Sequence, residues 1–369
     1  MSFKISGTKT DTARIIVIRQ DTWEIEANTV ISGSGEYEIP SLASGTKTVL
    51  AETESGQGVT YGGVESYYYL AYDRGIFFGG AKSTGDRDDI DYITIGMPGD
   101  AQDFGNLSTP RYDLAATSNG TYDRGLAMAS YGSDLIDYVT IMSLGNSQSF
   151  GVLTLGRQNI GATSNGTNNR GIAVAGMKFS TYYNIIDYVT ISTTGDAINF
   201  GDLNYRAEKI AACSNATNDR GIFAGGKIGS TTITPNISYR TISTTGDAAD
   251  FGDLSLSRSY LAGTSNGPNN KGIFGGGGNY SGDIKYNTID YVTISSLGNA
   301  QDFGDLYVIT RWGLAATSDG TNNRAVFAGG YASNYTNLID YVTITSNGDA
   351  QDFGDLTTAR AYFGGTSNA

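Results

Sequence analysis

The feature that most constrains the fold of this 369-residue chain is an internal repeat of about 50 residues. Its clearest segment opens with a basic residue and ends in small residues, as in Arg-Gly-Ile-Phe-Phe-Gly-Gly at 74–80. Copies of this segment begin at Arg74, Arg124, Arg170, Arg220, Lys271 and Arg324. Repeats of about 20–50 residues are typical of solenoids and propellers, in which each unit buries its apolar faces against its neighbours. The sequence therefore predicts an array of six units.

Three further segments keep the same count and order. An Ile-Asp-Tyr-Val-Thr-Ile segment begins at Ile90, Ile136, Ile186, Ile237 (as Ile-Ser-Tyr-Arg-Thr-Ile), Ile289 and Ile339. A Phe-Gly pair, usually preceded by Asp, lies at Phe104, Phe150, Phe200, Phe251, Phe303 and Phe353. A segment that runs on to Ser-Asn or Ser-Asp opens at Arg111, Arg157, Arg206, Arg258, Arg311 and Arg360. All four segments are short, rich in β-branched and aromatic residues and separated by turn residues, so each unit is expected to form four antiparallel strands.

The order of the segments at the two ends predicts a closed ring. The array begins at Arg74 with the second strand of a unit and ends at 366–369 with a first strand. Pairing these two strands would complete one blade from both ends of the chain and remove the exposed sheet edges. Four strands in about 50 residues match one propeller blade. We therefore expect an all-β chain with a six-bladed β-propeller at residues 63–369.

The repeat resembles that of the kelch family. Gly225-Gly226 lies at the kelch double glycine, Tyr188 at its tyrosine and Arg206 at its arginine. The match covers residues 66–369, and the usual tryptophan of the family is phenylalanine here. This resemblance implies a kelch-like β-propeller.

Residues 1–62 contain no copy of the repeat. Short stretches that read as strands lie at 15–18, 23–26, 37–39 and 49–51. The segment 35–45 resembles a hairpin of carboxypeptidase-regulatory or transthyretin-like domains. We expect a small N-terminal β-sandwich domain at 1–62, joined to the propeller by a glycine-rich linker at 56–66.

Charge and composition exclude several classes of partner. The formal net charge is −13 and the chain has no histidine. Such a surface repels phosphates and anionic headgroups, so we expect neither nucleic-acid nor membrane-surface binding. The sole cysteine, Cys213, excludes an internal disulfide and is expected to be a packed small residue. The N-terminus lacks the apolar core of a signal peptide, and no run of about 18 apolar residues occurs. We expect a chain made in a cytoplasm and not inserted into a membrane.

Three segments match catalytic motifs in sequence but lack the partner residues that those motifs require. Asp-Phe-Gly at 103–105 carries a magnesium-binding aspartate in kinases, but the partner His-Arg-Asp needs a histidine. Gly-Thr-Ser-Asn-Gly at 263–267 matches a nucleophile elbow, yet no histidine base exists. The four glycines at 275–278 are followed by no Gly-Lys-Ser/Thr. We expect no catalytic residues, no cofactor, no metal site and no enzymatic activity.

Two charged sets leave alternatives open. The six arginines that open the first strands favour a repeated structural role, such as pairing with aspartates, over a ring that binds an anion in the centre. The acidic run 86–91 has oxygen atoms enough for calcium, but a solvated loop is favoured because the spacing of a calcium loop is missing.

The variable loops are the candidate binding surface. The loops from second to third strands and from fourth to next first strands should share one face, and variable loops on a rigid scaffold commonly carry binding residues. Tyrosine offers a flat apolar ring and a hydroxyl, which suits sugars. The candidate ligand-binding residues are Tyr112, Tyr131, Tyr182, Tyr183, Tyr205, Tyr280, Tyr307, Trp312, Tyr331 and Tyr335.

The leading functional hypothesis is a non-enzymatic adhesin. The near-identical repeats behind a small N-terminal domain resemble propellers of bacteriophage tail-fibre and other virion structural proteins. This resemblance implies a virion-surface protein whose N-terminal domain contacts other virion or assembly proteins. The propeller would bind a host cell-surface glycan or protein. Homo-oligomers are an open alternative. An intracellular kelch-like scaffold for protein partners is the alternative, and a propeller glycosidase or lyase would need an acid–base set.

Overall fold

The computed structural model describes residues 73–279 and 283–369 in full, and the backbone of five strands near the N-terminus. The chain divides into two compact units, Met1–Leu70 and Ala71–Ala369. Each unit is described by itself below.

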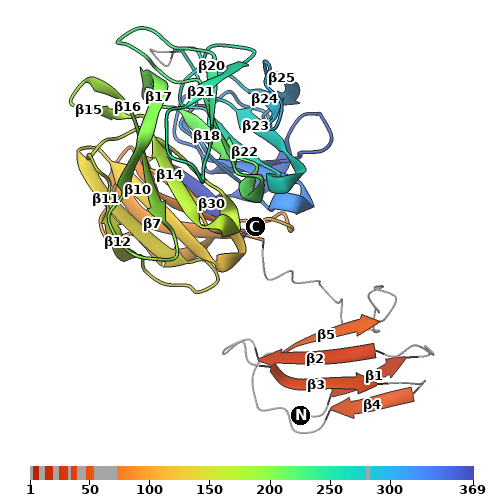
Figure 1. Ribbon diagram of the computed structural model, residues 1–369. Helices are drawn as coiled ribbons and strands as arrows, with labels where there is room; N and C mark the ends of the chain where they lie inside the picture. Colours follow the sequence, from red (N-terminus) through yellow and green to blue (C-terminus); the bar gives the residue numbers. More distant parts are fainter. Residues whose placement is uncertain are drawn as a thin grey trace. The chain divides into compact units, whose positions relative to one another are not determined.

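The N-terminal unit contains two antiparallel sheets (Figure 1). One pairs β1 (Phe3–Gly7) with β4 (Gly35–Ile39). The other places β2 (Ala13–Arg19) between β3 (Ile25–Ile31) and β5 (Lys47–Thr53). The packing between these sheets, on which the expected β-sandwich depends, lies outside the described residues.

The second unit is a six-bladed β-propeller built almost entirely from four-stranded antiparallel sheets (Figure 1). Blade 1 consists of β30 (Gly364–Ser367), β6 (Arg74–Lys82), β7 (Gly85–Thr94) and β8 (Gln102–Asn106). Blade 2 consists of β9 (Ala115–Ser118), β10 (Arg124–Ser130), β11 (Ser133–Thr140) and β12 (Gln148–Val152). Blade 3 consists of β13 (Gly161–Ser164), β14 (Arg170–Val174), β16 (Thr181–Thr190) and β17 (Ile198–Ala207), with the short β15 (Met177–Lys178) on β16.

The remaining blades follow the same plan. Blade 4 consists of β18 (Ala211–Ser214), β19 (Arg220–Ala224), β20 (Asn236–Thr241) and β21 (Ala249–Asp253). Blade 5 consists of β22 (Ala262–Ser265), β23 (Lys271–Gly275), β24 (Thr288–Thr293) and β25 (Gln301–Asp305). Blade 6 consists of β26 (Ala315–Ser318), β27 (Arg324–Ala328), β28 (Leu338–Thr343) and β29 (Gln351–Asp355). A 3-10 turn follows the first strand in blades 2 to 6, at η1 (Gly120–Tyr122), η2 (Gly166–Asn168), η3 (Ala216–Asn218), η4 (Gly267–Asn269) and η5 (Gly320–Asn322).

The ring closes where the order of the repeats predicts it. The last strand, β30, pairs antiparallel with β6, so that Ser367 lies opposite Gly75 and Gly364 opposite Phe78. Blade 1 is therefore assembled from both ends of the array, and unfolding it requires the ring to open.

Apolar residues fill the spaces between neighbouring blades. Between blades 4 and 5, Phe251 is 3% exposed and packs in one cluster with Val292 and Ile294 of the next blade. Cys213 lies in the same cluster, where burial raises the pKa of its thiol, as expected of a packed small residue. Burying one such phenylalanine contributes about 1.5–3 kcal/mol, and the pattern recurs at each junction.

The Phe-Gly pair is explained by this packing. The Gly298 N–H of blade 5 donates to the Phe251 carbonyl of blade 4 at 2.9 Å. A Cβ at Gly252, where φ is +150°, would lie 2.5 Å from the Gly298 carbonyl oxygen. Only glycine allows the two backbones to approach this closely. The Asp-Phe-Gly tripeptide therefore serves blade contacts.

Five of the six repeated arginines are buried within their blades. The Arg157 guanidinium lies 2.8 Å from Asp187, and both side chains are 0% exposed. The four other pairs join Arg111 to Asp137, Arg258 to Asp290, Arg311 to Asp340 and Arg360 to Asp91. The structural role is confirmed, and these five guanidinium groups form no central ring.

The prediction for Arg206 is wrong. This residue is exposed, and the place of the repeated arginine in blade 4 is taken by Ala207, whose carbonyl accepts from Gly176 N–H as the Arg258 carbonyl accepts from Gly226. Blade 4 has Ser238 where its sister blades have the paired aspartate. A buried guanidinium would have no counter-charge there, which explains the loss of the arginine.

Candidate binding site

Both sets of variable loops lie on one face of the propeller. In blades 1 and 3 to 6, a residue of the connection into the first strand forms a β-bridge with the loop after the second strand, as in Glu208 with Lys227 and Trp312 with Tyr331. We call this side the loop face, as distinct from the side that carries the 3-10 turns.

Six equivalent residues form a ring where the central channel opens on the loop face. The backbone N–H of each donates to the carbonyl of the member one blade earlier, at 2.7–3.1 Å, and the ring closes on itself. All six have a left-handed backbone, with φ between +56° and +64°. The members of this mouth ring are Asp113, Asn159, Lys209, Tyr260, Gly313 and Tyr362.

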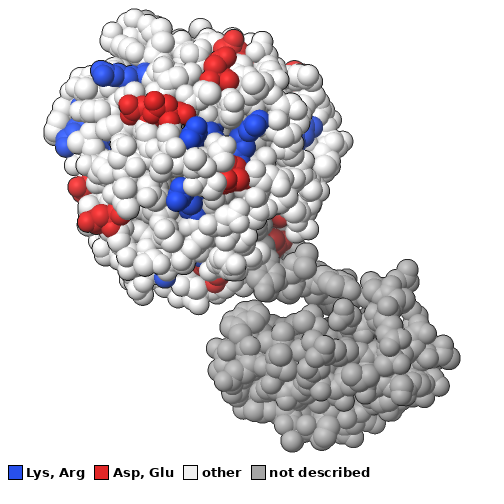
Figure 2. All heavy atoms as spheres, in the orientation of Figure 1, with Lys and Arg blue, Asp and Glu red and all other residues white. Residues whose placement is uncertain are grey.

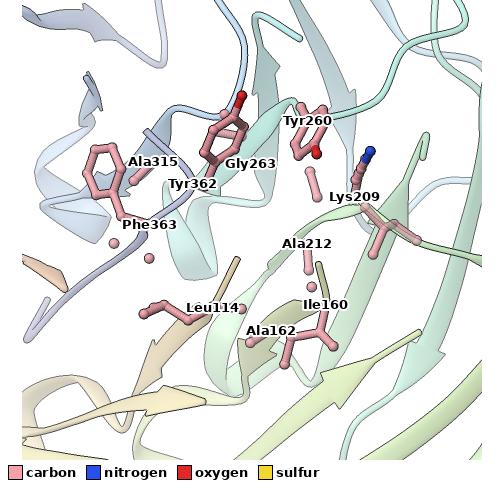
Figure 3. Close-up of a pocket in the computed structure, with 18 of the residues that line it drawn as sticks. Leu114, Ile160, Ala162, Lys209, Ala212, Tyr260, Gly263, Ala315, Tyr362 and Phe363 are labelled. Atoms are coloured by element: carbon pink, nitrogen blue, oxygen red, sulfur yellow. The ribbon is translucent and has the colours of Figure 1, made fainter. Parts of the chain in front are cut away.

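A cavity of about 110 Å³ lies within the mouth ring (Figure 3). Below the ring it is lined by apolar side chains and by the free backbone edges of the first strands. These side chains are Leu114, Ile160, Ile210, Leu261, Leu314 and Phe363, followed by alanines and glycines. The cavity is open to solvent at the mouth ring and has room for several water-sized groups.

One half of the mouth is polar. Glu208 accepts a hydrogen bond from Asn159 Nδ2 at 3.0 Å and lies 3.5 Å from Lys209 Nζ and 3.6 Å from Lys227 Nζ. Glu208 is only 1% exposed and Asp113 is 8% exposed. The carboxylate of Glu208 is therefore fully occupied by its neighbours.

The other half is aromatic. The Tyr260 ring lies 4.7 Å from Trp312 and 5.2 Å from Tyr362, measured between centroids. Figure 3 shows the Tyr260 and Tyr362 rings together, with Lys209 beside Tyr260. The Lys209 Nζ lies 4.2 Å from the centroid of the Tyr260 ring. A Cβ at Gly313 would lie 2.7 Å from the Tyr362 ring, so glycine at this position lets the aromatic group pack.

Burial, together with the charges of Glu208 and Asp86, raises the pKa of Asp113 to about 7. Lys209 and a hydrogen bond with Asn159 oppose this rise. Asp113 is therefore protonated below neutral pH and can then donate a hydrogen bond. A buried carboxyl with so strongly perturbed a pKa is typical of functional sites.

Four of the predicted tyrosine and tryptophan residues surround this mouth. Trp312 belongs to its aromatic half. Burial raises the pKa of Tyr112 and Tyr335, and the charge of Asp113 raises both further. The Tyr331 ring contacts that of Tyr335 at 5.2 Å.

The other predicted residues lie apart from the mouth ring or outside the described chain. Tyr131 is 60% exposed between β10 and β11, and Tyr307 is 39% exposed. Tyr182 and Tyr183 are half-buried on β16. The half-buried Tyr205 donates from its hydroxyl to blade 4 carbonyls at Gly225 and Asn236. Tyr280 lies outside the described residues.

Sequence reasoning missed the polar half of the site. Asp113, Glu208 and Lys209 occur in one copy of the repeat each. Tyr260 and Tyr362 are aromatic residues of the variable turns on the same face, but the ligand-binding candidates did not include them. The available signal was variability, since the mouth position differs between copies while the residue after it is apolar in every copy.

The acidic run at 86–91 is not arranged around a common centre. Asp89 pairs with Arg87, and Asp91 is buried against Arg360 and Thr357. In the described part of the chain, no group of three or more His, Cys, Asp or Glu side chains is placed to hold a metal ion.

Comparisons with known proteins give no family. No family model matches the chain, and no curated protein matches it. The resemblance to kelch repeats therefore rests on the repeat segments alone. No helix within the described residues is long and apolar enough to cross a membrane.

Proposed function

We propose that this chain is a non-enzymatic binding protein that recognises a cell-surface glycan with the loop face of its propeller. The observation that carries the proposal is the asymmetry of the mouth ring, in which six equivalent positions present an aromatic half and a polar half. Sugars offer both an apolar ring face and hydroxyl groups, so this arrangement suits them.

The charge distribution supports a neutral or mixed ligand. On the visible face of the propeller, basic and acidic residues are interspersed among uncharged surface (Figure 2). Such a surface offers no extended basic patch in this view to a polyanion.

The geometry favours binding over turnover. Glycoside hydrolysis commonly needs two carboxyl groups that flank the substrate. Beside the mouth, Glu208 is buried and held by Asn159 and two lysines, and Asp86 does not line the cavity, so Asp113 is the one carboxyl among the described residues that line it. A single carboxyl that hydrogen-bonds a ligand is sufficient for recognition.

The test uses the labelled full chain and a panel of bacterial cells, before and after removal of surface polysaccharide. Binding that is lost on removal is the expected result. Binding that persists on stripped cells would indicate a protein receptor and contradict the glycan proposal. Release of new reducing ends from the isolated polysaccharide would contradict the non-enzymatic part.

We also infer that the N-terminal unit attaches the propeller to a larger assembly such as a virion. The support is the division of the chain into two compact units, of which only the second contains the repeat. The full chain is then expected to sediment with intact particles in a density gradient, and a chain found only at the top of the gradient would contradict this.

A further inference from the structure

We propose that the mouth ring binds the ammonium group of an amino sugar between Asp113 and Tyr362, with the sugar itself resting on the aromatic half. This inference rests on the proposed glycan recognition and names the class of sugar. It is carried by a buried carboxyl and an aromatic ring that occupy neighbouring positions of the mouth ring.

Asp113 lies at the boundary between the polar and the aromatic half of the mouth. Its N–H donates to the Tyr362 carbonyl at 2.8 Å, and its own carbonyl accepts from the Asn159 N–H at 2.9 Å. Asp113 lines the cavity, is 8% exposed and forms no ion pair with a lysine or arginine of the described residues. A carboxylate withdrawn from water in this way is stabilised by an ammonium group that pairs with it.

The opposite boundary of the ring already holds an ammonium group in such a place. There the Lys209 Nζ lies 3.5 Å from Glu208 Oε1 and 4.2 Å from the centroid of the Tyr260 ring. A carboxylate and a tyrosine ring thus hold one cation by an ion pair and a cation–π contact.

At the Asp113 boundary the protein supplies the carboxyl and the ring. Burial raises the pKa of Tyr362 and the charge of Asp113 contributes, so the two groups lie within electrostatic reach. No lysine or arginine within residues 73–279 and 283–369 makes a cation–π contact with the Tyr362 ring. The ammonium group of a ligand would complete the arrangement seen at Lys209.

The charges around Asp113 favour a cation over an anion. Besides burial, the carboxylates of Glu208 and Asp86 raise the pKa of Asp113, while Lys209 opposes them. Lys209 is itself engaged by Glu208. An anionic ligand would meet this excess of negative charge, whereas an ammonium group would offset it. The formal net charge of −13 also attracts cations from a distance.

The surrounding tyrosines suit the rest of an amino sugar. The rings of Tyr260 and Tyr362 lie 5.2 Å apart between centroids and offer apolar surface to a sugar ring. Burial raises the pKa of Tyr112 and Tyr335, and the charge of Asp113 contributes to both shifts, so these hydroxyls lie near the carboxyl. They can hydrogen-bond to the sugar hydroxyls that flank the amino group. A lysine side chain would use the carboxyl but not these hydroxyls.

The tryptophan content allows a direct test in the full chain. Trp23 and Trp312 are the two tryptophans, so Trp23→Phe leaves Trp312, which contacts Tyr260 and Tyr362, as the only emitter. Glucosamine and galactosamine are titrated against its fluorescence at pH 7. Glucose and galactose are the matched sugars without an amino group, and N-acetylglucosamine has the nitrogen without its charge. Nα-acetyl-lysine amide carries an ammonium group without a sugar.

We expect the amino sugars to bind with an affinity at least about tenfold higher than that of the other probes at pH 7. This preference should be lost at pH 5, where the amino sugars are fully charged but Asp113, with a pKa of about 7, is protonated. The other charged or titratable groups that act on Asp113 or lie near it are Glu208, Asp86, Lys209, Lys227, Tyr112, Tyr260, Tyr335 and Tyr362.

Two variants locate the ammonium group. Asp113→Asn keeps the size of the side chain, removes its charge and is expected to abolish the preference at both pH values, with a melting temperature no lower than that of the parent. Asp86→Asn is the matched control, since it removes an exposed carboxyl nearby and should reduce the preference by less.

The remaining outcomes separate this inference from the proposed function. If plain sugars bind as well as amino sugars, or if Asp113→Asn leaves the preference intact, the amino-sugar assignment is wrong and glycan recognition stands. The assignment is also wrong if Nα-acetyl-lysine amide binds as tightly as glucosamine, which would indicate a protein partner. If no probe acts on Trp312 while polysaccharide-dependent binding to cells persists, only this inference fails. If neither sugars nor cells are bound, both proposals fail.

Discussion

One blade junction carries a pair of acidic side chains where the others carry an amide. On the side of the 3-10 turns, Asn165 Nδ2 donates to Asp219 Oδ1 across a junction at 2.9 Å. At the junction between blades 6 and 1 the equivalent positions are Asp319 and Asp73. Burial raises the pKa of Asp319 to about 6, and the charge of Asp73 contributes, although Arg324 opposes it. We therefore predict that Asp319→Asn stabilises the propeller at neutral pH.

The magnitude follows from the difference between the folded and unfolded pKa. A shift from 3.8 to about 6 corresponds to about 3 kcal/mol. Because the pKa of Asp319 is raised in the folded state, ionising this carboxyl destabilises the parent chain. The full stability is present below about pH 4 and is lost as the pH rises through about 6. Asp319→Asn removes the titration, so its advantage should be up to about 3 kcal/mol at pH 7.5 and about 1 kcal/mol at pH 4.5. The new amide can also donate to Asp73, as Asn165 does to Asp219.

Urea unfolding of the full chain at both pH values measures this difference. The matched control is Asn165→Asp, which places an acid opposite Asp219 and should destabilise the chain at pH 7.5 more than at pH 4.5. An Asp319→Asn variant that is no more stable than the parent at pH 7.5, or whose gain is equal at the two pH values, would refute the reasoning.

Three further changes test other contacts. Asp340 Oδ1 has no hydrogen-bond partner among the described residues, and Tyr307→Thr is expected to supply the hydroxyl present in other blades. This should add about 1 kcal/mol to the free energy of unfolding in urea, and no gain would contradict the reasoning. Asp290→Ala leaves the Arg258 guanidinium buried without its partner and should cost about 3–5 kcal/mol, whereas a loss below about 1 kcal/mol would show that the pair is dispensable. Asp113→Asn removes a carboxyl with a pKa of about 7. The variant should be up to about 4 kcal/mol more stable than the parent at pH 8 and nearly equal to it near pH 3, and a pH-independent effect would count against burial as the cause.

The fold could be predicted from the sequence because its determinants are local and repeated. The Phe251-Gly252 pair repeats because every junction requires the same close approach of two backbones. The order of segments at the ends implied the pairing of β30 with β6. The exception was Arg206, since only the pairing register, with Ala207 opposite Tyr183, shows that Ala207 and not Arg206 takes the buried position.

The site could be predicted only in part because it depends on convergence around the ring. Asp113, Lys209 and Tyr362 are separated by many residues in the chain, and only the closed propeller brings them to one mouth. The tyrosine-rich loops lie on the face that carries the mouth ring, and Trp312 contacts Tyr260 of that ring. The raised pKa of Asp113 depends on burial and on charges from other blades, which no local pattern records.

The central claim is that the mouth of the loop face binds the ligand, and the most direct test compares one tyrosine on each face. Tyr362→Ala changes the mouth ring, and Tyr122→Ala changes a residue that is 63% exposed in a 3-10 turn on the other side. Binding of the full chain to polysaccharide-bearing cells should fall at least about tenfold for Tyr362→Ala and remain unchanged for Tyr122→Ala. Loss of binding with Tyr122→Ala alone would place recognition on the opposite face and contradict the account.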